Sequence, residues 1–181
     1  MAQRHVPDGK LFSTRNSLDT DIRVDVVRTL NQSLADTTDL MTQVKHAHWN
    51  VKGPQFQQLH LLFDEQAELL AGHADRIAER ATALGGHAMG TARMAAGNSR
   101  LDEFPDEAVD GMDVVETLAD RFAEHGAYLR ENIDATLDMG DAVTSDMYTE
   151  LTEEVDKQLW FLESHLQGPD AVEETGITIP E

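Results

Sequence analysis

Five side chains between residues 45 and 80 could together bind a metal ion. Two are imidazoles and three are carboxylates: His48, His60, Asp64, Asp75 and Glu79. They stand in a stretch whose Leu, Phe and Ala residues otherwise follow a helical pattern. Imidazole and carboxylate ligands suit a divalent first-row metal ion, and the oxygen-rich set favours iron(II) over zinc.

The spacing places four of these groups along one face of one helix. His60 and Asp64 are four residues apart, as are Asp75 and Glu79, so each pair can chelate an ion. At 100° per residue, all four fall within an arc of about 100°. The two pairs are nevertheless about 16 Å apart along the axis, a gap that metal–ligand bonds of about 2.0–2.2 Å cannot bridge. One chain therefore cannot complete the site.

Two antiparallel copies of this helix can complete it. About a two-fold axis near Leu69 and Leu70, His60 meets the partner's Glu79 and Asp64 meets the partner's Asp75. The two equivalent sites then lie about 22 Å apart. The contact between two carboxylates is costly when buried without a cation, which argues for an ion between them. His48 is in phase with the inward stripe of the preceding helix and is the fifth predicted ligand.

Four long helical patterns are expected to position these groups, over residues 21–50, 55–84, 112–139 and 142–167. No segment alternates with period two, so the predicted fold is all-α, a four-helix bundle. The long connection over residues 85–110 favours ferritin-like connectivity, and "EFPDEAVD" (103–110) is expected to form a short extra helix. Residues 1–20 and 168–181 are expected to be tails around one bundle domain, 21–167.

The composition is strongly acidic, with 34 acidic against 14 basic residues and a formal net charge of −20. Such a field repels nucleic acid and attracts cations. An acidic, lysine-poor surface is typical of proteins from salt-accumulating halophiles. There is no cysteine for a thiolate metal site, no apolar run long enough to span a membrane and no secretory signal, so a soluble cytoplasmic protein is expected.

Three stretches around the predicted ligands, "HAHWNVKG", "LHLLFDE" and "HADRIAERATALGG", closely resemble Dps, the miniferritin family of DNA-binding proteins from starved cells. "DKQLWFLESHL" is similar to the last helix of that family, and the resemblance covers roughly residues 20 to 167. It implies a hollow dodecamer with intersubunit ferroxidase centres, where iron(II) is oxidised to iron(III), preferentially by hydrogen peroxide, and stored. The family's ligand positions fall on His48, His60 and Asp64 of one subunit and on Asp75 and Glu79 of its neighbour.

The resemblance also implies roles for residues outside the ligand set. Trp49 matches a tryptophan near the family's centre, which implies an electron donor that limits radical escape; a packing role is equally open. Asp141 and Asp146 match carboxylates of a three-fold pore through which iron enters. The lysine-rich arm of DNA-binding members is missing here, because the N-terminal tail offers only three cations, so direct DNA binding is not favoured: Arg4, Lys10 and Arg15.

The leading interpretation is therefore an iron-storing ferroxidase that consumes peroxide, and the alternative is a nucleoid-associated protein that binds and protects DNA directly. An intrasubunit di-iron enzyme would need Glu-x-x-His motifs, and no glutamate has histidine three residues later. A fourth possibility is a helical oligomer whose polar seam only fixes register. The remaining histidines are expected on the surface or in tails: His5, His46, His73, His87, His125 and His165.

Overall fold

The computed structural model describes residues 11–168, in which the chain forms five α-helices and no strand. Four of them are the predicted long helices, and every boundary falls within one residue of the expected one. The helices are α1 (Thr20–Asn50), α2 (Phe56–Ala83), α3 (Ala92–Asn98), α4 (Gly111–Asp138) and α5 (Ala142–Leu166). The predicted all-α bundle is confirmed.

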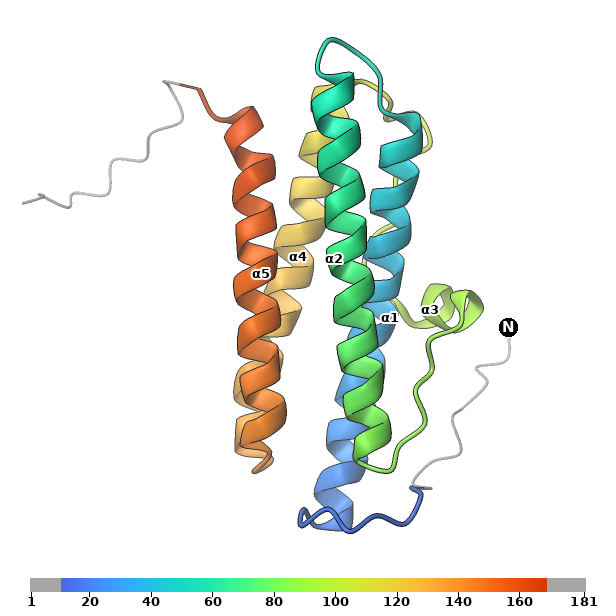
Figure 1. The fold of residues 1–181 in the computed structure, drawn as a ribbon, viewed down its shortest axis with the longest axis vertical. Coiled ribbons are helices and arrows are strands. Elements are labelled where there is room, and N and C mark those ends of the chain that lie inside the picture. Colours follow the sequence, from blue (N-terminus) through green and yellow to red (C-terminus); the bar gives the residue numbers. More distant parts are fainter. Residues whose placement is uncertain (1–10, 169–181) are drawn as a thin grey trace, which may run out of the picture.

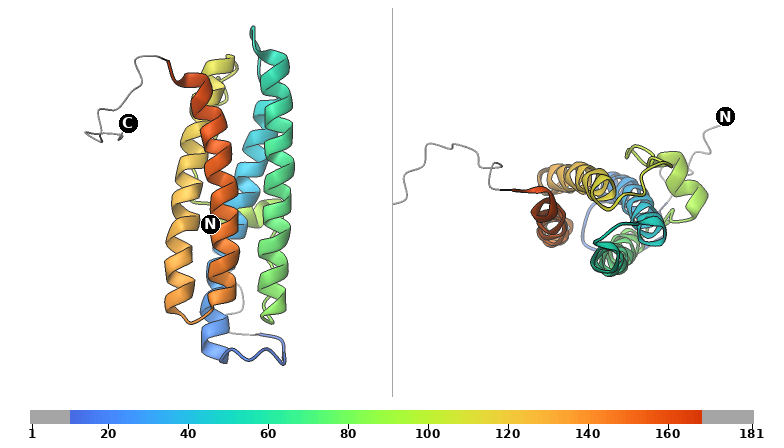
Figure 2. Two further views of the ribbon diagram at one scale, coloured as in Figure 1. Left: turned by 60° about the vertical axis from the view of Figure 1, so that its left-hand side comes forward. Right: turned by 90° about the horizontal axis from the view of Figure 1, so that it is seen from above.

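The four long helices lie side by side with their axes roughly along one direction (Figures 1 and 2). The chain runs up α1 and down α2, returns through a long crossover, and then runs down α4 and up α5 (Figure 1). Because α2 and α4 run in the same direction, the crossover must span the length of the bundle. This is the ferritin-like connectivity expected from the long connection.

The core is formed by the apolar stripe that each long helix turns inward. Its largest fully buried side chains come from all four long helices and include Leu30, Leu40, Phe63, Leu118, Phe122, Tyr148 and Leu151. On α2 the buried positions recur at three- and four-residue steps, which leaves the opposite face of that helix in solvent. The exposed face of α2 is where the predicted carboxylate ligands lie.

The short extra helix was predicted at the wrong place in the crossover. It is α3, where the hydroxyl of Thr91 accepts a hydrogen bond from Met94 N–H and so caps an alanine-rich segment. Residues 103–110 contain only one turn, in which Ala108 N–H donates to the carbonyl of Pro105. After this turn the chain pairs briefly with the α1–α2 connection, through an isolated bridge between Lys52 and Asp110.

Several polar contacts join α2 and α5 along one seam, beside the apolar core that the four long helices share. Along this α2–α5 seam, Arg76 pairs with Glu150, and the side chain of Gln66 donates weakly to the carbonyl of Gln158. His73 contacts Glu154 midway along the seam. At the end near the α4–α5 turn, Arg80 binds both carboxylate oxygens of Asp141 and the hydroxyl of Thr144.

Residues 11–19 precede α1 and lie against the end of α2, where Phe12 N–H donates to the carbonyl of Gly85 at 2.7 Å. The rest of the predicted tails, 1–10 and 169–181, lies outside the described residues, so the division into tails and bundle stays a prediction. None of the helices in residues 11–168 is long and apolar enough to cross a membrane.

Candidate metal centre

Two of the predicted ligands, His48 and His60, are in direct contact across the α1–α2 hairpin. The turn between the helices includes Gly53, whose φ of +112° is a conformation that favours glycine. The turn brings the last part of α1 against the first part of α2, and the two imidazole rings stack with their centroids 3.8 Å apart and their planes 19° from parallel. The two predicted histidine ligands therefore lie together within one protomer.

Backbone hydrogen bonds fix the tautomer of both rings. The Nδ1 atom of His48 lies 2.7 Å from the carbonyl of His60, and Nδ1 of His60 lies 2.9 Å from the carbonyl of His48. Because a carbonyl can only accept, each Nδ1 carries the proton and donates it. In the neutral ring the Nε2 atom then keeps its lone pair, the arrangement that a metal-binding histidine requires.

Asp64 lies one helical turn after His60, and its negative charge is balanced by a lysine. The ammonium Nζ of Lys45, on α1, contacts one carboxylate oxygen at 2.6 Å. This hydrogen bond lowers the pKa of Asp64 below its ordinary value. A metal ion that binds Asp64 through this oxygen must therefore displace the ammonium group of Lys45.

Asp75 and Glu79 lie further along the same uninterrupted helix, and both are exposed. Their distance from Asp64 along the axis is about 16 Å or more, because α2 rises by about 1.5 Å per residue. Among residues 11–168, no three His, Cys, Asp or Glu side chains are grouped so that one protomer could hold a metal ion. Each protomer thus carries the predicted ligands in two separated sets, and the shared site stays a prediction.

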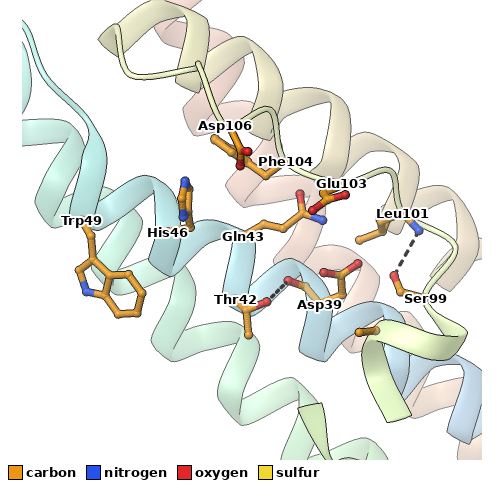
Figure 3. A pocket seen from close by; sticks show the side chains of 11 residues that line it. Asp39, Thr42, Gln43, His46, Trp49, Ser99, Leu101, Glu103, Phe104 and Asp106 are labelled. Atoms are coloured by element: carbon orange, nitrogen blue, oxygen red, sulfur yellow. Dashed lines mark hydrogen bonds between the residues drawn. The ribbon is translucent and has the colours of Figure 1, made fainter. Parts of the chain in front are cut away.

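Trp49 lines a cleft on the outer side of α1 and is 67% exposed. The cleft has a volume of about 520 Å³ and lies between α1 and the crossover (Figure 3). Half-buried His46 faces the same cleft, with its ring 5.3 Å from that of Phe104, and Asp39, Glu103 and Asp106 give the walls a negative charge. The redox role of Trp49 stays a prediction.

The two predicted pore residues have different surroundings. Asp146 is exposed near the start of α5, as a pore carboxylate would need to be. Asp141 is 2% exposed, caps the N-terminus of α5 and binds Arg80 with both oxygens. Burial would raise the pKa of Asp141, but hydrogen bonds from Thr144 and Arg80 outweigh it, and the pKa is lowered. Asp141 thus has a structural role in the protomer, and the pore assignment of both residues stays a prediction.

Two histidines expected at the surface are instead buried in the bundle. His73 is 2% exposed and His125 is 1% exposed, so this expectation was wrong for both. The sequence contained the signal, because His73 follows Leu70 by three residues and precedes Ile77 by four, which places it on the inward stripe of α2. Lys45 was also missed as a neighbour of the site, although it lies three residues before His48 and so on the same helix face.

The ferritin-like domain family matches residues 27–171 of this chain. The chain is 38% identical to the DNA protection during starvation protein of Agrobacterium fabrum over 158 residues, which cover 87% of this chain and 98% of that protein. Among solved structures, Mycobacterium smegmatis Dps in its tetragonal form superposes with a TM-score of 0.83 at 30% identity, covering 87% of this chain and 94% of that one.

An archaeal Dps homologue from Halobacterium salinarum superposes with a TM-score of 0.83 at 26% identity, covering 98% of each chain. The similarity therefore extends over nearly the whole length of these relatives, and not over a shared motif alone. Together with the bundle connectivity and the ligand pattern on α1 and α2, it shows that the chain belongs to the Dps family of ferritin-like proteins.

Proposed function

We propose that this protein oxidises iron(II) with hydrogen peroxide at centres shared by two protomers, and stores the resulting iron(III) in a hollow shell. Two iron(II) ions give up one electron each, and one peroxide molecule accepts both electrons and becomes two hydroxide ions. Because both electrons are taken up at one centre, no hydroxyl radical is released. The protein protects the cytoplasm against oxidative damage by removing both reagents.

The observation that carries this proposal is the division of the ligands along α2. His60 and Asp64 at the start of α2, together with His48 at the end of α1, would form one half of a centre. Asp75 and Glu79, three turns later on α2, would form the other half. An antiparallel neighbour related by a two-fold axis completes two equivalent centres at once. The fold and the family are compatible with a closed homo-oligomer built from such dimers, which we take to be a dodecamer.

Lys45 compensates the negative charge of Asp64 before an ion binds. Its ammonium group occupies the side of Asp64 that the ion would use, and an incoming iron(II) replaces one positive charge by two. The net charge of −20 raises the local concentration of iron(II) around the shell. The imidazoles of His48 and His60 need no change of tautomer when the ion binds.

The test is to mix two inactive variants. His60→Ala destroys the first half of every centre and Asp75→Ala destroys the second half, so each variant alone should lose fast peroxide-dependent iron oxidation. In a mixed dimer, the first half-centre of the second variant, with its intact His60, faces the second half-centre of the first variant, with its intact Asp75. One of the two centres is then complete. With random pairing, half of the dimers are mixed and half of their centres are intact, so about one quarter of the wild-type rate should return.

The mixture is prepared by refolding the variants together, and the control is each variant refolded alone. A centre formed within one chain would give no recovery, because neither chain carries both residues. Light scattering before and after refolding shows whether the oligomer is assembled. An assembled mixture that stays inactive would rule out the shared centre.

The protection of DNA that the name of the Agrobacterium relative states refers to that protein. For this chain we propose protection of DNA through the removal of iron and peroxide, without direct contact, because the strongly negative charge opposes binding to phosphates. Gel retardation at low salt tests this: the protein should leave the mobility of linear DNA unchanged, and a shift that disappears at high salt would contradict the proposal.

A further inference from the structure

The cleft between α1 and the crossover combines negative charge, aromatic walls and a buried hydrogen-bond acceptor. Its volume of about 520 Å³ is within the range of about 300–1,000 Å³ that is usual for small-molecule pockets. Its walls come from α1 and from the crossover, and they include none of the five predicted iron ligands (Figure 3). The shared iron centre therefore does not account for this cleft.

Gln43 brings to the wall of the cleft an acceptor atom that no donor satisfies. The residue is 6% exposed, and its Nε2 atom donates to the carbonyl of Asp102 at 3.0 Å. Because that carbonyl can only accept, the amide cannot be turned over, and Oε1 is the atom that stays free. Within residues 11–168, Oε1 has no hydrogen-bond partner. Buried polar atoms are nearly always paired, so this oxygen indicates a missing donor.

Three carboxylates around the same cleft have no cation beside them. Asp39 belongs to α1, whereas Glu103 and Asp106 belong to the crossover. In the described part of the chain, none of the three forms an ion pair. Arg121 approaches the crossover, but it donates to the backbone carbonyls of Asp102 and Glu103. The missing donor should therefore carry positive charge.

The length of the cleft favours an elongated organic cation over a metal ion. Asp39 and Trp49 lie about 15 Å apart along α1, at about 1.5 Å per residue. No three His, Cys, Asp or Glu side chains among residues 11–168 converge on one point where a metal ion could bind. The largely exposed ring of Trp49 and the neighbouring rings of His46 and Phe104 offer apolar walls. An ammonium group is attracted to the face of a tryptophan ring.

We propose that this cleft binds a linear aliphatic polyamine. One ammonium group donates to Oε1 of Gln43, another lies against the ring of Trp49, and the methylene chain between them covers the apolar wall. The three carboxylates compensate the charges. The side chain of Glu103, next in sequence to the carbonyl that holds Gln43, is exposed and has no hydrogen-bond partner in residues 11–168. It can therefore turn aside and admit an ammonium group to Oε1, because exposed side chains change rotamer within nanoseconds.

Spermidine, a linear triamine, is the probe, and the fluorescence of Trp49 is the signal. The parent protein is the full chain with Trp160→Phe, which removes the other tryptophan, an exposed residue of α5. It is freed of metal ions with a chelator and dialysed into low salt. Spermidine should change the emission saturably, and calorimetry should give one molecule per protomer. Magnesium chloride at the same ionic strength should not produce a saturable change.

The hydrogen bond to Gln43 can be tested from both of its ends. Gln43→Met removes Oε1 at nearly constant shape and should weaken spermidine binding by about 10–100-fold, the usual effect of a hydrogen bond to a charged group. Fully quaternised spermidine keeps the three charges but has no N–H group. It should bind the parent more weakly by a similar factor and should not respond to Gln43→Met. Circular dichroism shows whether the variant is folded, and the comparison of the two amines on the parent needs no substitution at Gln43.

A matched pair of double variants separates the cleft from the general attraction of a polycation to an acidic protein. Glu103→Gln with Asp106→Asn should weaken spermidine binding by about 3–10-fold at low salt. Asp138→Asn with Glu153→Gln removes the same charge from exposed positions on α4 and α5, and should leave the affinity unchanged.

Four results would each overturn the proposal. They are the absence of saturable binding at one molecule per protomer, an equal response to magnesium, equal binding of spermidine and its quaternised form, and an equal loss of affinity in the two double variants. Oε1 of Gln43 would then be paired with a water molecule only. Because the parent is free of iron and binding is measured without oxidation, these results are independent of the mixed-variant experiment.

Discussion

The burial of His125 predicts a loss of stability in mild acid that can be calculated and removed by one substitution. Burial holds the pKa of this ring at about 3 in the folded protein, against an ordinary value of 6.5. In the unfolded chain the ring takes up a proton as the pH falls below 6.5, whereas the folded protein does not. The unfolding free energy is therefore unaffected by His125 above pH 6.5, and this group lowers it progressively between pH 6.5 and pH 3.

The magnitude follows from linkage between protonation and folding. Between pH 7 and pH 5 this one group should remove about 2 kcal/mol of unfolding free energy per protomer, rising to about 4 kcal/mol at pH 3. His73 should add to the loss in the same direction, because burial lowers its pKa as well. A loss of about 2 kcal/mol corresponds to a shift of about 1 M in the urea midpoint for a typical denaturant slope.

The assay is urea unfolding at pH 7 and pH 5, followed by circular dichroism at one fixed protein concentration with a chelator present. The His125→Leu variant should lose about 2 kcal/mol less than the wild type over this interval. His165→Gln, at an exposed site, should behave like the wild type. If His125→Leu and the wild type show the same change in midpoint between the two pH values, the buried ring is not the origin of the acid sensitivity and the reasoning fails.

Three further substitutions test other contacts. Lys45→Met should return the pKa of Asp64 towards its ordinary value. It should also lower the iron(II) concentration needed for half-maximal oxidation, measured by stopped-flow absorbance. If this iron(II) concentration is unchanged or higher, the ammonium group does not compete with the ion. Asp141→Ala should destabilise the protein by about 3–5 kcal/mol in urea unfolding, because it leaves Arg80 without its partner in a buried pair. Gly85→Ala should cost at least about 1–3 kcal/mol in the same assay, since its φ is +87° and an added Cβ would lie 2.5 Å from a backbone oxygen; a variant of wild-type stability would show that this turn rearranges easily.

The long helices could be predicted because their sequence pattern and their environment agree. Each has an apolar stripe on one side and charged residues on the other, and Gly-Pro or Gly-Gly marks an end of α1 or α2. The short helix could not be placed as well, because seven residues are too few to show a periodic stripe. Its position depends on the Thr91 cap and on packing against α1, and the sequence alone does not rank those contacts against the turn at Pro105.

The sequence predicts which residues of the candidate site share a helix face, but it does not predict their hydrogen bonds. Helix periodicity alone places His60 and Asp64 on one face and shows that Asp75 is out of their reach. The exchange of hydrogen bonds between the rings of His48 and His60 depends on the tight approach of two helices, which spacing does not reveal. The pairing of Lys45 with Asp64 likewise depends on how α1 crosses α2.

The unbroken course of α2 between Asp64 and Asp75 has a consequence for how this chain can vary. Deleting or inserting one residue there would rotate everything beyond it by about 100° and shift it by about 1.5 Å. In the proposed two-fold dimer the neighbouring molecule would carry the same error, so both of the proposed shared centres would be lost together. Exposed side chains along this spacer can be exchanged, but its length cannot.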